Sequence, residues 1–203
     1  MAPMMSGDKH DFRVVNDFAR DTAWLHGFME FVAKDGIAFM ALALVAGWWI
    51  ARRARSPRGV ALSVWGALAA LIAVGIAQPI SHAADETRPF EIPTLHALTL
   101  IHHSTDPGFP SDHATAAGAV AAALCFVSWR LGVVAWLAAL ILAFSRVYVG
   151  VHFPQDVAAG LALGAVVAAI GALLIGPIMT RIADWLTRTP LRVLIVADGG
   201  AQA

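Results

Sequence analysis

The chain has 203 residues, of which 59% are hydrophobic and 14% are charged. Soluble domains are about 45–50% apolar, so this composition excludes an ordinary soluble protein and indicates one that is built for the membrane. The formal net charge is +0, which offers no basic surface for nucleic acid. The length suits one domain over residues 1–203, and the sequence points to no protein partner and no particular oligomeric state.

The first 35 residues differ in character from the rest. In the segment Asn16–Lys34, apolar side chains recur at helical spacing with charged residues between them. This pattern is typical of an amphipathic helix in the membrane interface, so we interpret residues 1–35 as an N-terminal interfacial segment. Alternatively, the segment extends the first membrane-spanning helix, because the apolar run that follows it is short for a full crossing.

Five apolar runs follow, and they approach the length needed to cross about 30 Å of hydrocarbon. A helix satisfies its own backbone hydrogen bonds in lipid, so we expect each run to form a transmembrane helix. The sequence therefore predicts an all-α integral membrane bundle of about five transmembrane helices within residues 36–180, with a tail over residues 181–203. The expected helices are Ile37–Ile50, Val60–Ile80, His113–Trp129, Leu131–Val149 and Val157–Met179.

Arginines are concentrated in the segments that would lie on one side of a five-helix bundle. The positive-inside rule makes that side cytoplasmic, so residues 181–203 are expected to form a cytoplasmic tail. The N-terminus, the polar segment Ser81–Asp112 and the link Val149–Pro154 then lie on the extracytoplasmic face of the plasma membrane. Within the polar segment, Thr94–Ile101 is expected to form a short interfacial helix. The arginines on the cytoplasmic side are Arg52, Arg53, Arg55, Arg58, Arg130, Arg181, Arg188 and Arg192.

Three polar clusters fall at helix ends on the extracytoplasmic side. Ionisable groups are costly to place near a bilayer, so a set that converges on one face indicates a functional site. The clusters are Arg88-Pro89-Phe90, Pro110-Ser111-Asp112-His113 and Ser145–Asp156.

The donors in these clusters suit a phosphoryl group. Arg88 and Arg146 each offer a planar fork of N–H donors that matches phosphate oxygens. Ser111 and the free N–H groups at the start of the third expected helix add neutral donors. Because the arginines can neutralise the phosphate charge, we expect no metal and no cofactor.

The remaining residues suit proton transfer and nucleophilic attack. Histidine is the side chain whose ordinary pKa lies closest to physiological pH, and His113 and His152 together supply a nucleophile and an acid. Asp156, four residues after His152, can accept a hydrogen bond from the other ring nitrogen and fix the tautomer. These residues are sufficient for phosphoryl transfer through a covalent phosphohistidine.

The clusters resemble the signatures of the type-2 phosphatidic acid phosphatase superfamily, which also includes the vanadium haloperoxidases. Its patterns are Lys-x6-Arg-Pro, Pro-Ser-Gly-His and Ser-Arg-x5-His-x3-Asp. The third pattern is intact here between Ser145 and Asp156. The second reads Pro-Ser-Asp-His, with Asp112 at the glycine position, and the first keeps Arg88 but has Ser81 at the lysine position.

The resemblance implies a role for each matched residue. It makes His152 the nucleophile and Asp156 the residue that orients it. It makes His113 the general acid that protonates the leaving group. The implied phosphate ligands are Arg88, Ser111 and Arg146.

Two departures from the family pattern bear on the substrate. Ser81 removes one phosphate contact, for which the neighbouring His82 is a candidate substitute. The Pro-Ser-Asp-His form is similar to the branch that dephosphorylates undecaprenyl diphosphate, the polyprenyl carrier of bacterial cell-wall precursors. We interpret Asp112 as a substrate-binding residue that helps to hold Arg88 or Arg146 for a longer, more charged head group.

The resemblance therefore implies a metal-independent membrane phosphatase that converts a polyprenyl diphosphate to the monophosphate and inorganic phosphate. One alternative is a lipid phosphomonoesterase acting on phosphatidic acid, phosphatidylglycerol phosphate or a prenyl-phosphoribose phosphate, because fold and motif do not fix the lipid. A more distant alternative is a transporter or scaffold that has kept the site without catalysis. A transporter would need polar residues at the bilayer midplane, and the apolar runs have almost none.

Two other patterns have ordinary explanations. Gly160 and Gly164 form a small-xxx-small pair that is typical of close helix packing. A group of histidines and aspartates resembles a metal site in composition but lacks a helical ligand pair of the His-Glu-x-x-His kind, so we do not expect it to bind metal. The group is His102, His103, Asp106, Asp112 and His113.

Overall fold

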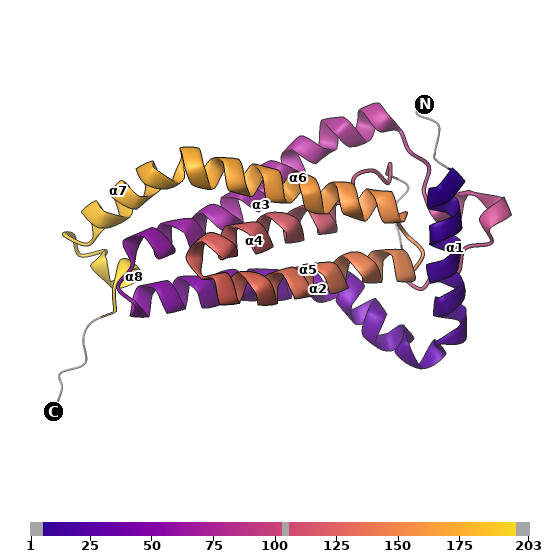
Figure 1. Ribbon diagram of the computed structural model, residues 1–203, viewed down its shortest axis with the longest axis horizontal. Coiled ribbons are helices and arrows are strands. Elements are labelled where there is room, and N and C mark those ends of the chain that lie inside the picture. The colour runs from indigo at the N-terminus through magenta and orange to yellow at the C-terminus, as the bar shows by residue number, and fades with distance from the viewer. Residues whose placement is uncertain (1–5, 103–105, 198–203) are drawn as a thin grey trace.

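The structure, a computed structural model, describes residues 6–102 and 106–197, and the regular elements within these ranges are all helices. Five long helices lie side by side in a bundle, and the first helix crosses one end of it (Figure 1). Short 3-10 turns occur at Ala23–Leu25, Pro89–Glu91 and Pro93–Leu95. The α-helices are α1 (Ser6–Asp21), α2 (His26–Arg53), α3 (Pro57–Ala84), α4 (Asp112–Val127), α5 (Trp129–Tyr148), α6 (Pro154–Leu174), α7 (Gly176–Leu186) and α8 (Arg192–Ile195).

The bundle is built around α4, which packs against α2, α3, α5 and α6. Seven of the 16 residues of α4 are alanine and ten of its residues are buried, so neighbouring helices approach it closely. Three described segments are long and apolar enough to cross a membrane. They are α5, α6 and the segment Pro57–Glu91, which contains α3, whereas α4 is a shorter apolar helix. The prediction of an all-α integral membrane bundle is confirmed, with α2 as its fifth helix.

The N-terminal prediction was wrong in its boundaries. Asn16–Lys34 is not one helix, because α1 ends at Asp21 and α2 begins at His26 and continues through the first apolar run. At the break, the Thr22 carbonyl oxygen accepts from the Leu25 N–H of the 3-10 turn at 2.8 Å and from the Tyr148 hydroxyl at 3.0 Å. The alternative of an extended first spanning helix is therefore correct from His26 onwards.

Helix α1 packs on the protein as well as facing outwards. The Phe12 ring is fully buried and meets the Phe153 ring edge-on at 5.5 Å, whereas Val14 and Phe18 are exposed. The Asn16 amide donates to the Leu98 carbonyl oxygen at 2.9 Å, and its oxygen accepts from the Leu98 N–H at 2.8 Å. These contacts hold α1 over the polar end of the bundle.

The segment Thr94–Ile101 is not a helix, contrary to expectation. It begins in the 3-10 turn Pro93–Leu95 and then runs without regular structure. Its backbone bonds go elsewhere: the Leu100 N–H donates to the Val149 carbonyl oxygen at 3.1 Å, and Leu98 is held by Asn16. Tertiary partners have replaced the local helical ones.

The last expected helix, Val157–Met179, is divided in two. Helix α6 ends at Leu174 and α7 starts at Gly176, with Pro177 in its first turn, where a proline needs no N–H partner. Residues 181–203 are not a simple tail either. Ile195 of α8 is buried in a cluster with Ala51, and the Ala197 N–H donates to the Arg52 carbonyl oxygen at 3.1 Å.

Glycines bring α4 and α6 into backbone contact. A methyl group on Gly164 would lie 2.0 Å from the Thr115 carbonyl oxygen, and one on Gly160 would lie 2.7 Å from the Ser111 carbonyl oxygen. On α4, Gly118 faces the backbone of Leu161 in the same way, at 2.4 Å. The close packing that was predicted for Gly160 and Gly164 is confirmed, and it fixes the start of α4 against the start of α6.

This contact predicts a clear difference between two glycines. Gly164→Ala should destabilise the protein by about 1–3 kcal/mol, because its methyl group collides with backbone that cannot move aside. Gly75→Ala is the matched control, since Gly75 lies in α3 with no atom within 4 Å of the added methyl group. The measurement is the unfolding of each purified variant in detergent. Equal stabilities for the two variants would contradict the packing described here.

Candidate active site

The three polar clusters meet at one end of the bundle. Arg88 lies in the loop after α3, residues 110–113 lead into α4, and residues 146–156 pass from α5 to α6. A cavity of about 530 Å³ lies between them, walled by α2, α3, α4, α5 and the loops. Of the predicted site residues, Arg88, Asp112, His113, Arg146 and His152 line this cavity.

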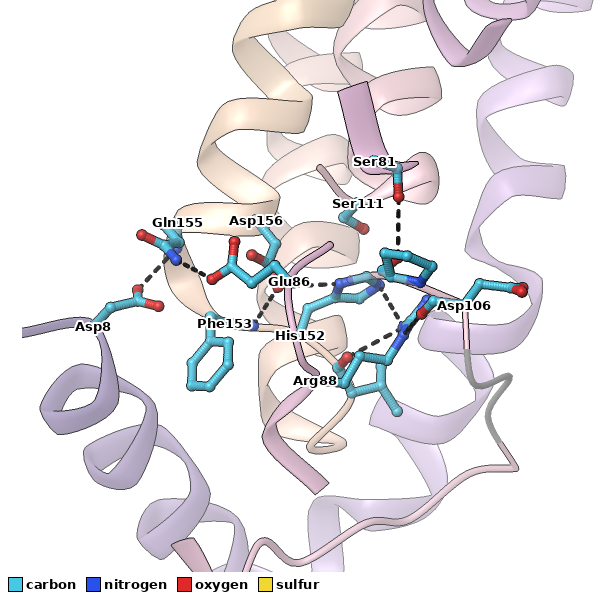
Figure 2. Close-up of polar contacts among 12 residues, drawn as sticks. Asp8, Ser81, Glu86, Arg88, Asp106, Ser111, His152, Phe153, Gln155 and Asp156 are labelled. Carbon is cyan, nitrogen blue, oxygen red and sulfur yellow. Dashed lines mark hydrogen bonds and ion pairs between the residues drawn. The ribbon is translucent and has the colours of Figure 1, made fainter. Parts of the chain in front are cut away.

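His152 lies between a carboxylate and a guanidinium group. It is buried, at 3% exposure, in the turn between α5 and α6, and Figure 2 shows it with Asp156 on one side and Arg88 on the other. Its Nδ1 lies 3.4 Å from Asp156 Oδ2, and its Nε2 lies 3.4 Å from Arg88 Nη1. Because a guanidinium only donates, Nε2 is the acceptor, and the ring proton is on Nδ1 facing the carboxylate. The lone pair of Nε2 therefore faces Arg88, and both residues line the cavity.

Asp156 holds both the histidine and the helix that carries it. Its Oδ2 also accepts the Phe153 N–H at 2.8 Å, which caps the first turn of α6. The side chain is fully buried, and Oδ1 has no hydrogen-bond partner among the residues that the structure describes. The carboxylate is thus fixed by the helix start and oriented towards His152.

Each arginine is held by carbonyl oxygens and keeps donors for a ligand. Arg88 donates from Nε to the Asp106 carbonyl oxygen at 2.7 Å and from Nη1 to the Val151 carbonyl oxygen at 3.3 Å. Arg146 donates from Nη1 to the Ala33 carbonyl oxygen of α2 at 2.9 Å. A guanidinium carries five N–H groups, so both retain donors at the cavity wall.

The charges around His152 favour a neutral imidazole. Burial is the main cause that lowers the pKa of His152 well below its ordinary value of 6.5, and the positive charges of Arg146 and Arg88 lower it further. A lowered pKa means that the ring is protonated only below that value, so at neutral pH Nε2 is unprotonated.

The two serines of the motifs lie behind the cavity wall. The Ser111 side chain is fully buried, its N–H donates to the Asp156 carbonyl oxygen at 3.0 Å, and its hydroxyl has no partner among the described residues. Ser145 donates its hydroxyl to the Leu142 carbonyl oxygen at 2.7 Å. The phosphate contact of Ser111 stays a prediction, whereas the Ser145 hydroxyl is engaged by the backbone of its own helix.

Asp112 has a different partner from the one we expected. Its two carboxylate oxygens accept from Gln78 Nε2 of α3 at 3.1 and 3.2 Å, and it is exposed. Among the described residues no hydrogen bond joins Asp112 to Arg88 or Arg146, and it affects these arginines through its negative charge, so its substrate-binding role stays a prediction. Gln78 gave no sequence signal, since it lies in the apolar run of α3, outside the polar clusters.

The residues at the lysine position of the first pattern also line the cavity. Ser81 donates its hydroxyl to the Pro107 carbonyl oxygen at 3.3 Å, so its donor is already engaged. His82 is exposed at the cavity wall. Substitution of the lysine by His82 stays a prediction.

A carboxylate network behind Asp156 was not anticipated. The Gln155 N–H donates to Asp8 Oδ1 at 3.1 Å, and its side-chain amide donates to Glu86 Oε1 (Figure 2). Burial raises the pKa of Asp8. The network joins α1, the loop after α3 and the start of α6, and no local pattern in the sequence connects these segments.

The predicted absence of a metal site concerns five residues, of which His103 lies outside the described ranges. His102, Asp106, Asp112 and His113 all line the cavity. Over residues 6–102 and 106–197, no three histidine, cysteine, aspartate or glutamate side chains are grouped closely enough to hold a metal ion.

Comparisons with known proteins agree with this geometry. The model of the PAP2 superfamily matches residues 63–179. Undecaprenyl-diphosphatase BcrC of Bacillus subtilis is 33% identical over 175 residues, which cover 86% of this chain and 83% of that protein.

Two solved structures share the fold. The structure of Aquifex aeolicus LpxE matches with a TM-score of 0.67 at 21% identity, covering 85% of this chain and 99% of that chain. The structure of a transmembrane PAP2-type phosphatidylglycerolphosphate phosphatase from Bacillus subtilis matches with a TM-score of 0.61 at 21% identity, covering 87% and 90%. The residues that the family model matches run from α3 into α7, and they include all three polar clusters.

Proposed function

Because this chain belongs to the PAP2 superfamily and is a membrane lipid phosphatase, we propose that it hydrolyses a polyprenyl diphosphate to the monophosphate and inorganic phosphate. The observation that carries the proposal is the buried imidazole of His152, held between Asp156 and Arg88 at the wall of a polar cavity. The choice of a diphosphate is supported by the similarity to an undecaprenyl-diphosphatase over most of both chains.

In the first step, Nε2 of His152 attacks the terminal phosphorus atom. A bond forms between nitrogen and phosphorus while the bond to the bridging oxygen breaks, and the lipid monophosphate leaves with the electron pair. Arg88 and Arg146 bind the phosphoryl oxygens and stabilise the charge that develops on them. Asp156 stabilises the positive charge that the imidazole gains. Beside the anionic diphosphate His113 carries a proton, which it donates to the leaving oxygen.

In the second step, water attacks the phosphohistidine. His113, now neutral, takes a proton from the water, the nitrogen–phosphorus bond breaks, and inorganic phosphate is released. The neutral imidazole of His152 is restored, with its lone pair again on Nε2. The arginines supply the charge neutralisation, so this mechanism requires no metal.

A second candidate is hydrolysis of a lipid phosphomonoester. It is favoured by the likeness to a phosphatidylglycerolphosphate phosphatase, although at 21% identity this likeness concerns the fold. The two reactions differ in their leaving groups, since a lipid phosphate is a much weaker base than an alkoxide. A proton from His113 therefore matters more for the monoester.

We further propose that the site faces the extracytoplasmic side of the plasma membrane. Arg52 and Arg53 end α2 and Arg58 lies in the first turn of α3, while Arg130 starts α5, and the site lies beyond the other ends of these helices. The positive-inside rule places the arginine-rich end in the cytoplasm.

The substrate is tested by phosphate release from undecaprenyl diphosphate, phosphatidic acid and phosphatidylglycerol phosphate, with purified protein in excess chelator. We expect the highest kcat/KM for the diphosphate. General-acid help is worth about 10²–10⁴-fold, and His113→Ala should show this full loss only with the monoesters. His10→Ala is the matched control, because its side chain is exposed on α1 and outside the cavity.

Two results would contradict parts of the proposal. A wild-type preference for phosphatidic acid would remove the polyprenyl assignment and leave the phosphatase. Loss of activity in chelator, with recovery on adding one metal, would show that the arginines do not suffice.

The orientation is tested with single cysteines in a Cys125→Ala background. Asp17→Cys lies on α1, at the same end as the site, and the Asp17 side chain is 74% exposed. Arg188→Cys follows α7 at the opposite end, where Arg188 is exposed. In intact cells an impermeant maleimide should label Asp17→Cys, and should label Arg188→Cys only after permeabilisation. The reverse pattern would place the site in the cytoplasm.

A further inference from the structure

We propose that Lys34 of α2 binds the second phosphate of a diphosphate substrate, the one that remains on the lipid. This inference rests on the proposed function and assigns a specificity-determining residue to the same cavity. Lys34 lies in a helix that contributes none of the three polar clusters, so the clusters give no indication of such a role.

The position of Lys34 is tied to the phosphate-binding arginines. Lys34 lines the cavity together with Arg88, Arg146 and His152. The residue before it, Ala33, accepts a hydrogen bond from Arg146 Nη1 through its carbonyl oxygen at 2.9 Å. This bond fixes the backbone of α2 against the Arg146 guanidinium, so Lys34 starts directly beside the arginine.

The burial of the lining residues divides the cavity into a floor and a rim. His152 and Arg88 are buried and form the floor, whereas Lys34 and Gln78 are exposed and form the rim. A phosphoryl group that meets Nε2 of His152 must sit at the floor. The rest of the substrate then passes the rim, and in a diphosphate the first group to pass is the second phosphate.

The charges on the wall match this division. The arginine and lysine side chains among the described lining residues are Arg88, Arg146 and Lys34. Two of them serve the transferred phosphoryl group, which leaves Lys34 as the strong cation for a second one. At the rim, the Asp112 carboxylate is engaged by Gln78, which moderates its repulsion of phosphate.

Lys34 is also free to change partner. Its Nζ lies 3.2 Å from Glu30 Oε2 one turn earlier, with the two side chains 51% and 32% exposed. Exposed pairs of this kind contribute little stability, and a phosphate offers an ammonium group more charge and more acceptors than one carboxylate does. Exchange of Glu30 for the substrate therefore costs little. A monoester has no second phosphate at the rim, so Lys34 discriminates between the two substrate classes.

The test is equilibrium binding of methylenediphosphonate and of orthophosphate to the full-length protein in detergent, measured by calorimetry. Lys34→Met should weaken binding of the diphosphonate about five- to tenfold and leave orthophosphate binding within twofold, because only the diphosphonate reaches the rim. Lys34→Arg should restore most of the loss. Lys9→Met is the matched control, since Lys9 lies on α1 and does not line the cavity.

The outcomes separate this inference from the proposed function. Unchanged diphosphonate binding in Lys34→Met, or an equal loss for both ligands, overturns the role of Lys34. Since binding is measured without turnover, this holds whichever lipid the wild-type enzyme prefers. A wild-type preference for monoesters, by contrast, overturns the polyprenyl assignment by itself.

Discussion

The site depends on the backbone contact between α4 and α6. Gly160 and Gly164 allow the start of α4 to lie directly on α6, and the Ser111 N–H then reaches the Asp156 carbonyl oxygen at 3.0 Å. This single crossing aligns the segment that carries His113 with the turn that carries His152. Any larger side chain at the glycines would separate the two helices, and with them the two histidines.

The aligned residues form a site that is ready before the substrate arrives. His152, Asp156 and Arg88 are buried, and each is held by at least one backbone hydrogen bond or by a neighbour in the set. Fixed dipoles and charges in a region of low dielectric stabilise a developing charge more than mobile water does. Burial also keeps the imidazole of His152 neutral at neutral pH, which is the form that the proposed attack on phosphorus requires.

The sequence predicts the residues of the site better than it predicts the residues that pack around them. The spacing from Arg146 to Asp156 places the residues on one helix end, the turn and the next helix start, so local geometry alone brings His152 and Asp156 together. The hydrogen-bond partners of Asp112 and Arg146, which are Gln78 and Ala33, could not be predicted. Both partners lie in apolar stretches, and helix packing decides which way their side chains and carbonyl groups point. The break between α1 and α2 was missed for the same reason, since one of its hydrogen bonds comes from Tyr148 on another helix. The family resemblance carried the roles of the histidines and arginines, which composition and spacing alone leave open.

The central claim is that His152 carries the phosphoryl group during turnover. The most direct measurement is rapid quenching of the enzyme with undecaprenyl diphosphate labelled in its terminal phosphate, followed by peptide mass spectrometry. We expect label that is lost in acid and retained in base, located on His152, weaker in Asp156→Asn and absent from His152→Ala, which should have no turnover. Label on another residue, or robust turnover by His152→Ala, would contradict the account.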